Sequence, residues 1–207
     1  MTPAKQRQVR KQLIAVDPRL APVFDAVPPW KVSENRNVPE SLMRAIVSQQ
    51  LSTKVANVIW SRFQAACGEQ VAPWNVMKLS DETLRGCGLS RQKAGYLRNV
   101  AEFAIAHNLD TEHLSNLTDK DVIEFLTRIK GVGRWTVEML LIFVLDRPDV
   151  FPVDDLGIQN AMRRLYRMRS KGRAFVRRME FHARPWRPYR STVVRCLWRW
   201  TDNEPTA

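Results

Sequence analysis

The sequence predicts an all-α fold, and three observations support this prediction. Apolar residues recur at spacings of three and four over most of the chain, and the alternation typical of strands is nearly absent. The eight Gly and twelve Pro fall mostly between these periodic segments. With 207 residues, 44% of them hydrophobic, the chain can bury a sizeable core. We expect one two-lobed helical unit over 1–207, with a central lobe at 38–145 and a second lobe from 1–37 plus 146–207.

The first long periodic segment extends over residues 39–67, and Gly68 is expected to end it. Leu51-Ser52-Thr53 interrupts the pattern, so we expect two helices here, with Ser52 as the cap of the second.

Three further helices are expected to begin at hydroxyl-bearing residues that cap helix N-termini. Ser80 opens a short helix that ends at Gly86 or Gly88, and Ser90 begins a longer one. Thr118, three residues before an Asp, resembles a capping box in front of the apolar run VIEFLTRI.

The net charge of +12 is concentrated in one segment. Residues 161–200 contain 13 Lys or Arg and one acidic residue, so this segment alone carries a net +12. All but Lys171 of these basic residues are Arg, whose forked guanidinium fits phosphate oxygens. A polyanionic partner is the favoured interpretation, and a solvated basic face or an anionic membrane surface are the alternatives.

Several classes of protein are excluded by what the sequence lacks. Cys67, Cys87 and Cys196 are widely spaced and form no C-x-x-C pair, which argues against a structural zinc site, an iron–sulfur cluster or a disulfide framework. We expect no catalytic metal and no cofactor. The N-terminal apolar run is too short for a signal peptide, and no segment approaches the roughly 20 apolar residues of a membrane span. A reducing, cytoplasmic location is expected, next to the nucleoid in a bacterium.

A hairpin is predicted at 129–134, between helical stretches at 119–129 and 134–145. Gly131 and Gly133 flank one apolar residue, which permits a tight turn and a close approach of the backbone to a partner. The free N–H groups at the start of the following helix can hold a phosphate. A purely structural turn is the alternative.

Two adjacent carboxylates follow about twenty residues later, in the segment DVFPVDDLGIQ. Pro152 interrupts the chain, and a helix is expected to begin near residue 155. Asp154 and Asp155 are each suited to cap that helix, which is the simplest interpretation. The helix dipole also favours a negative charge there, and an ionised carboxylate beside a phosphate-binding hairpin could stabilise a positively charged transition state.

These segments together resemble a known family. IKGVGRWTVEMLLIF, DVFPVDDLGIQ and WRPYRSTVVRCLW, preceded by AIVSQQLSTKVA, are similar in sequence and order to the helix-hairpin-helix Gly-Pro-Asp superfamily of DNA glycosylases. Within it, the chain most resembles the 3-methyladenine (alkylbase) group. The resemblance extends from about residue 38 to 200. Larger bacterial members have an extra N-terminal sheet domain, for which this chain is too short and too helical.

The resemblance implies that Asp155 is the catalytic aspartate, because Ile158 stands where the family has an aliphatic residue three positions later. Asp154 is then expected to be a cap or loop residue. Trp135 occupies the place where the endonuclease III branch has its nucleophilic lysine, and Lys130 lies outside that place. The four-Cys cluster of that branch is also missing. A monofunctional glycosylase is therefore implied.

The same resemblance implies contacts to an extruded base. Trp135 and Trp186 match aromatic residues of the family's pocket, and aromatic faces attract cationic alkylated purines. Met139 and Leu156 stand where some members have Tyr, which makes the pocket less aromatic. Each Trp could instead be part of the core.

Gln50, next to Gln49, aligns with the residue that fills the gap left by the extruded base; a helix interruption without function is the alternative. Residues expected to hold phosphates are Lys130, Gly131, Gly133 and Arg134. The family's hairpins can also bind a monovalent cation through main-chain carbonyls. Arg190 and Ser191 are expected to brace the pocket or the backbone.

The function implied is repair of alkylated DNA: a monomer flips 3-methyladenine or 7-methylguanine out of double-stranded DNA and hydrolyses the N-glycosidic bond. One alternative is a non-catalytic helix-hairpin-helix protein that only binds DNA. Another is a glycosylase for a different lesion, such as 8-oxoguanine, a mismatch or uracil. No membrane association is expected.

Overall fold

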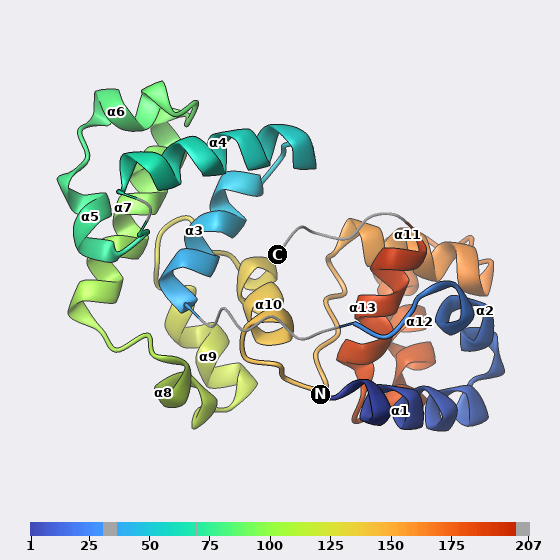
Figure 1. Ribbon diagram of the computed structural model, residues 1–207. Coiled ribbons are helices and arrows are strands. Elements are labelled where there is room, and N and C mark those ends of the chain that lie inside the picture. The colour runs from blue at the N-terminus through green and yellow to red at the C-terminus, as the bar shows by residue number, and fades with distance from the viewer. Residues whose placement is uncertain (31–36, 69, 202–207) are drawn as a thin grey trace. The chain divides into compact units, whose positions relative to one another are not determined.

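The computed structural model describes residues 1–30, 37–68 and 70–201, and every regular element within them is helical (Figure 1). The prediction of an all-α fold is confirmed. The α-helices and the two 3-10 helices (η) are α1 (Pro3–Val16), η1 (Pro18–Leu20), α2 (Ala21–Ala26), α3 (Val38–Ser48), α4 (Thr53–Ala66), α5 (Pro73–Lys78), α6 (Asp81–Gly86), α7 (Arg91–Ala106), α8 (Thr111–Ser115), α9 (Asp119–Leu126), α10 (Arg134–Phe143), α11 (Leu156–Tyr166), α12 (Gly172–Ala183), η2 (Arg184–Trp186) and α13 (Arg190–Trp200).

The chain folds into two compact units. Among the described residues, the central unit consists of 37–68 and 70–145, and the terminal unit combines 1–30 with 146–201. The terminal unit is thus built from both ends of the described chain.

Helix α3 forms the apolar centre of the central unit. It contacts α4, α7 and α10, and α7 also packs against α5 (Figure 1). Leu42, Met43 and Ile46 of α3 are fully buried, and they repeat at the spacing that places side chains on one face of a helix. The hairpin follows α9 and leads into α10, so both of its arms are fixed within this unit.

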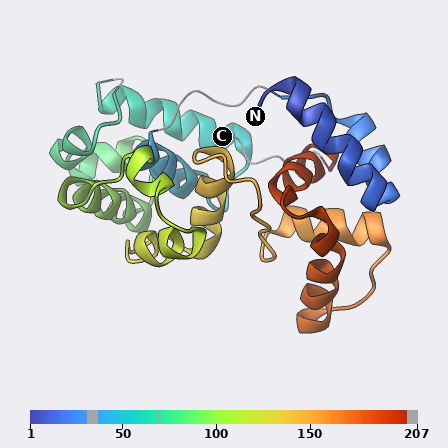
Figure 2. The ribbon, with the colours of Figure 1, turned by 90° about the horizontal axis from the view of Figure 1, so that it is seen from below.

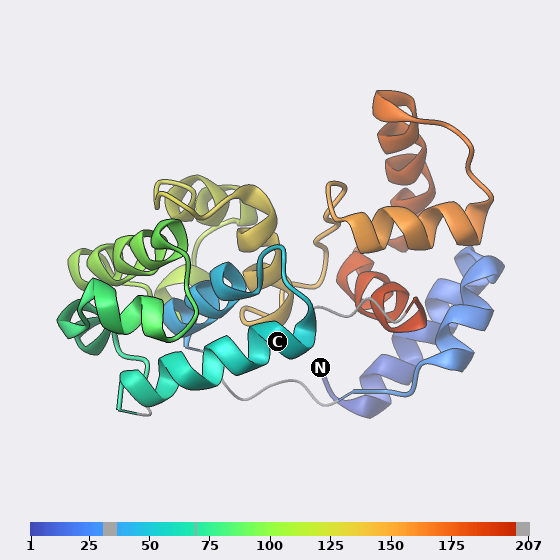
Figure 3. The same ribbon diagram turned by 90° about the horizontal axis from the view of Figure 1, so that it is seen from above.

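Helix α13 has the same role in the terminal unit. All of its residues from Ser191 to Trp198 are buried, and it packs against α2 and α11. Helices α1 and α12 lie at opposite ends of this unit (Figure 2, Figure 3), and η2 contacts both. Helices from the two ends of the chain therefore share one core.

The predicted helix starts are confirmed at three caps. The side chains of Ser80, Ser90 and Thr118 each accept a hydrogen bond from the backbone N–H three residues later. Helix α4 ends just before Gly68, whose φ of +75° explains the glycine there. Ser52 precedes α4 as predicted, although its side chain makes no capping hydrogen bond.

Candidate functional site

Asp155 is held rigidly at the N-terminus of α11. Its Oδ1 accepts hydrogen bonds from the backbone N–H of Ile158 at 2.7 Å and from the indole Nε1 of Trp198 at 2.8 Å. The side chain is only 6% exposed. A carboxylate so fixed, at the positive end of a helix, is preorganised to stabilise a positive charge.

The neighbouring Asp154 has a different place. It is exposed and lies in the turn that precedes the helix. Asp154 was expected to be a cap or loop residue; it is a loop residue, and Asp155 itself caps α11. A single residue thus combines the structural role and the proposed chemical one.

Trp198 and Gly157 complete the surroundings of Asp155. A Cβ at Gly157 would lie 3.0 Å from Trp198 Cδ1 and 3.1 Å from Asp155 Oδ1, so any side chain there would crowd this contact. The sequence analysis missed both residues. The available signal was weak: a buried Trp usually needs a partner for its indole N–H, and an Asp 43 residues away supplies it here.

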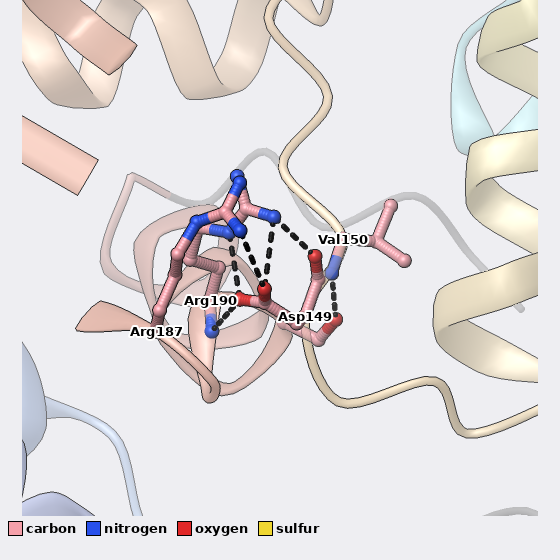
Figure 4. Close-up of polar contacts among 5 residues, drawn as sticks. Asp149, Val150, Arg187 and Arg190 are labelled. Carbon is pink, nitrogen blue, oxygen red and sulfur yellow. Dashed lines mark hydrogen bonds and ion pairs between the residues drawn. The ribbon is translucent and has the colours of Figure 1, made fainter. Parts of the chain in front are cut away.

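The loop that leads to Asp155 is tied to the start of α13 (Figure 4). Arg190 binds both carboxylate oxygens of Asp149, at 2.7 and 3.0 Å, and also its backbone oxygen at 2.7 Å. Arg187 lies 3.8 Å from the same carboxylate, and Ser191 Oγ accepts from the N–H of Val150 at 2.9 Å. The expected bracing role of Arg190 and Ser191 is confirmed for the backbone.

The four residues expected to contact the base lie in different surroundings. Leu156 is 69% exposed and follows Asp155 directly. Trp135 is half-buried and Met139 is buried, one turn apart on α10. Trp186 is fully buried, and its indole donates to Asp17 at 3.2 Å. Trp186 is therefore a core residue, which was the alternative to the pocket position that the resemblance implied.

The hairpin uses its two glycines for different purposes. Gly131 has a φ of +103°, and a Cβ there would overlap the Tyr96 ring. The close approach of Tyr96 therefore requires a glycine at 131, and the expected contact of this residue with DNA stays a prediction. A Cβ at Gly133 would meet nothing within 4 Å, and this residue is exposed. Gly133 thus leaves open the N-terminus of α10, where backbone N–H groups can bind phosphate.

The charged residues of the hairpin lie at the surface. Lys130 is exposed, and its carbonyl accepts from Asn99 Nδ2 at 3.0 Å, which anchors the turn on α7. Arg134 is exposed as well, and its Nε donates to Glu138 at 2.9 Å. Both side chains are thus exposed on a backbone that is held in place, so an anion can reach them.

A second turn in the central unit contains Gln49 and Gln50. Gln49 directly follows α3 as its C-terminal cap, and Gln50 is exposed with a φ of +59°. A side chain other than Gly in the left-handed region costs roughly 1–2 kcal/mol, so the surroundings must hold this turn in shape. Such strain is often found at functional positions.

The arginines of the basic segment divide into two groups. Four are engaged within the terminal unit: Arg163 donates to the Ser170 carbonyl, Arg190 pairs with Asp149, Arg195 lies 3.7 Å from Asp146, and Arg199 lies 5.0 Å from the centre of the Trp30 ring. The exposed basic residues of this segment are Arg164, Arg167, Arg169, Lys171, Arg173, Arg177, Arg178, Arg184 and Arg187. These exposed side chains can meet an external polyanion, although Arg187 also lies 3.8 Å from Asp149.

The described residues contain no group of three or more His, Cys, Asp or Glu that could hold a metal ion. Burial raises the pKa of the Cys67 and Cys196 thiols to about 11, so neither is suited to act as a thiolate. Among the described helices, none is long and apolar enough to cross a membrane.

Known proteins resemble this chain over most of its length. The sequence profile of the HhH-GPD superfamily of base excision DNA repair proteins matches residues 43–188. DNA-3-methyladenine glycosylase 1 of Schizosaccharomyces pombe is 38% identical over 185 residues, which are 87% of this chain and 80% of that protein.

Two solved structures have the same fold. The S. pombe 3-methyladenine DNA glycosylase (Mag1) in complex with abasic DNA has a TM-score of 0.80 and 34% identity over 93% of this chain and 95% of that chain. The DNA-3-methyladenine glycosidase from Bacillus halodurans has a TM-score of 0.78 and 35% identity, over 94% and 88%. The family suggested by the hairpin and by the motif around Asp155 is confirmed, and the chain belongs to the HhH-GPD superfamily of base excision DNA repair proteins.

Proposed function

We propose that this protein is a monofunctional DNA glycosylase that removes alkylated purines of the 3-methyladenine and 7-methylguanine type, leaving an abasic site. The observation that carries the proposal is the buried, doubly hydrogen-bonded carboxylate of Asp155. It lies in a chain that is 38% identical to a protein named for this activity. A relative that only binds DNA would need a cap at this position but no charge, because Asn caps a helix about as well as Asp.

Asp155 acts electrostatically in this reaction. Alkylation at N3 or N7 makes the purine a good leaving group, so the bond to the sugar breaks with development of an oxocarbenium-like positive charge. The fixed carboxylate stabilises that charge and helps to orient the attacking water. Leu156, exposed beside it in the same unit, supplies apolar surface to the extruded base.

The central unit provides the contacts to the DNA backbone and to the gap in the duplex. The open N-terminus of α10 at Gly133 receives a phosphate, with Lys130 and Arg134 adding positive charge. Gln50 fills the space that the extruded nucleotide leaves, with Gln49 beside it. We further propose that the protein acts as a monomer on damaged double-stranded DNA in the cytoplasm.

A panel of duplexes, each with one lesion, tests this function. We expect release of 7-methylguanine and 3-methyladenine, strand breaks only after alkali, and no covalent trapping by borohydride, because Trp135 cannot form an imine. DNA binding without any base release would favour the non-catalytic alternative. Release of 8-oxoguanine or uracil in place of alkylated bases would overturn the substrate class, and efficient trapping would overturn the monofunctional mechanism.

A further inference from the structure

The turn that carries Gln50 is fastened by a lysine from a different helix. Lys93 of α7 extends its ammonium to the end of α3, where Nζ donates to the backbone oxygens of Val47 and Gln49, each at 2.7 Å. These partners lie 46 and 44 residues earlier in the sequence. The contact therefore depends on the packing of α7 against α3.

The two hydrogen bonds have different consequences. Val47 lies in the last turn of α3, where carbonyls lack partners within the helix, so this bond caps the helix. Gln49 lies beyond the helix, and its carbonyl shares a rigid peptide plane with the N–H of Gln50. The ammonium thereby fixes the plane that leads into Gln50, whose φ of +59° is otherwise unfavourable.

Lys93 is itself well placed to impose this geometry. It lies in the first turn of α7, where its backbone N–H donates to the capping oxygen of Ser90 at 3.2 Å. Its side chain is half-buried, and burial lowers the pKa of the ammonium, because removal from water disfavours the charged form. The two carbonyls at the negative end of α3 offset part of that cost.

We propose that Lys93 is a positioning residue for base extrusion: it holds the turn Gln49–Leu51 in the shape that presents Gln50 to the DNA. This inference rests on the proposed function. It predicts that loss of the ammonium slows extrusion of the base, whereas the chemical step at Asp155 and the hold of the hairpin on phosphate remain.

The variant that tests this is Lys93→Met, which keeps an unbranched side chain but removes the donors. Lys78→Met is the matched control, because Lys78 is an exposed lysine of the same unit at the end of α5. We expect Lys93→Met to release 7-methylguanine from a paired duplex about tenfold more slowly under single-turnover conditions. Lys93→Arg should recover part of the rate, since Arg can donate to both carbonyls.

The defect should depend on how much extrusion the substrate requires. When the lesion lies opposite an abasic site, the base is already less well held, and the Lys93→Met defect should shrink to less than about threefold. A variant that is merely less stable would lose the same factor on both substrates. Thermal unfolding of all variants, measured alongside, identifies any that fail to fold.

A double-mutant cycle locates the effect. If Lys93 acts through Gln50, Lys93→Met should add little to the loss already caused by Gln50→Ala; additive losses would overturn the inference. Fluorescence of 2-aminopurine beside the lesion reports unstacking without any base release. If the wild-type protein unstacked the probe but released no base, the proposed function would be wrong. The role of Lys93 would still be tested, by comparing how well Lys93→Met unstacks the probe. An active wild type with an unimpaired Lys93→Met would overturn the inference alone.

Discussion

The turn before Asp155 and the hairpin at Gly131–Gly133 are both tight turns that precede a helix, yet they are built in opposite ways. Side chains from α13 close the first, with Trp198 on Asp155 and Arg190 on the loop before it. The second leaves its helix N-terminus open at Gly133. A carboxylate that must face one developing charge gains from rigid, dry surroundings, whereas a phosphate site needs access to the backbone.

The largest effect should come from the charge in the closed turn. Asp155→Asn keeps an oxygen for Ile158 and Trp198, and Asn caps helices about as well as Asp, so the fold should persist. Base release should fall about 100-fold or more, while binding to DNA stays within a few fold. The measurement is single-turnover release of 7-methylguanine.

Asp154→Asn is the matched control, because it removes the same charge from an exposed position one residue earlier. We expect it to retain nearly full activity. If Asp154→Asn were the inactive variant and Asp155→Asn the active one, the assignment of the catalytic carboxylate would be wrong.

The two glycines of the hairpin should differ in kind. Gly131→Ala introduces a Cβ at a φ of +103° and against the Tyr96 ring, so it should lower the free energy of unfolding by roughly 2–4 kcal/mol. Gly133→Ala has space for its methyl group and should unfold much like the wild type, with weaker DNA binding. Chemical denaturation and binding curves measure the two effects. Equal losses of stability would contradict the distinction between an internal and an open glycine.

A smaller change should follow from loosening Asp155 without removing its charge. Trp198→Phe takes away one charge-assisted hydrogen bond, typically about 1.5–3 kcal/mol, of which only part is expressed in the transition state. We expect base release to slow about tenfold. Trp186→Phe is the comparison, because it removes an indole N–H of the same unit that donates to Asp17. This variant should lower the free energy of unfolding and have little effect on the rate of base release. If Trp186→Phe slowed base release and Trp198→Phe did not, Trp186 would belong to the base pocket after all.

What the sequence could predict depends on the distance along the chain over which each feature is encoded. The caps at Ser80, Ser90 and Thr118 need only a hydroxyl and an N–H three residues away, so a local pattern suffices to locate them. The same holds for the end of α4 before Gly68. The helical fold followed from many such local signals.

The contacts that complete the candidate site could not be predicted in this way. The Trp198–Asp155 and Lys93–Gln49 hydrogen bonds join residues more than 40 positions apart. They exist only once α13 has packed on α11 and α7 on α3. Residue type indicates that a buried donor needs a partner, but packing selects which one.

The last contrast, with the smallest expected effect, is between exposed and internal arginines. Arg173, Arg177 and Arg178 are exposed on α12, whereas Arg163 donates to the Ser170 carbonyl and lies 3.7 Å from the centre of the Phe175 ring. For each phosphate that the protein no longer neutralises, the slope of log K against log salt should become shallower by about 0.9. Replacing the three exposed residues by Gln should therefore flatten the slope for undamaged duplex by between about 1 and 3.

Arg163→Gln should leave that slope unchanged and instead lower the melting temperature, because its guanidinium is already engaged within the terminal unit. The measurement is binding by fluorescence anisotropy over a series of salt concentrations. An unaltered slope in the triple variant would show that the exposed face of α12 is solvated and meets no phosphate. The positive charge that binds DNA would then come from outside this face, and the hairpin is one such source, since Lys130 and Arg134 lie beside the open helix N-terminus.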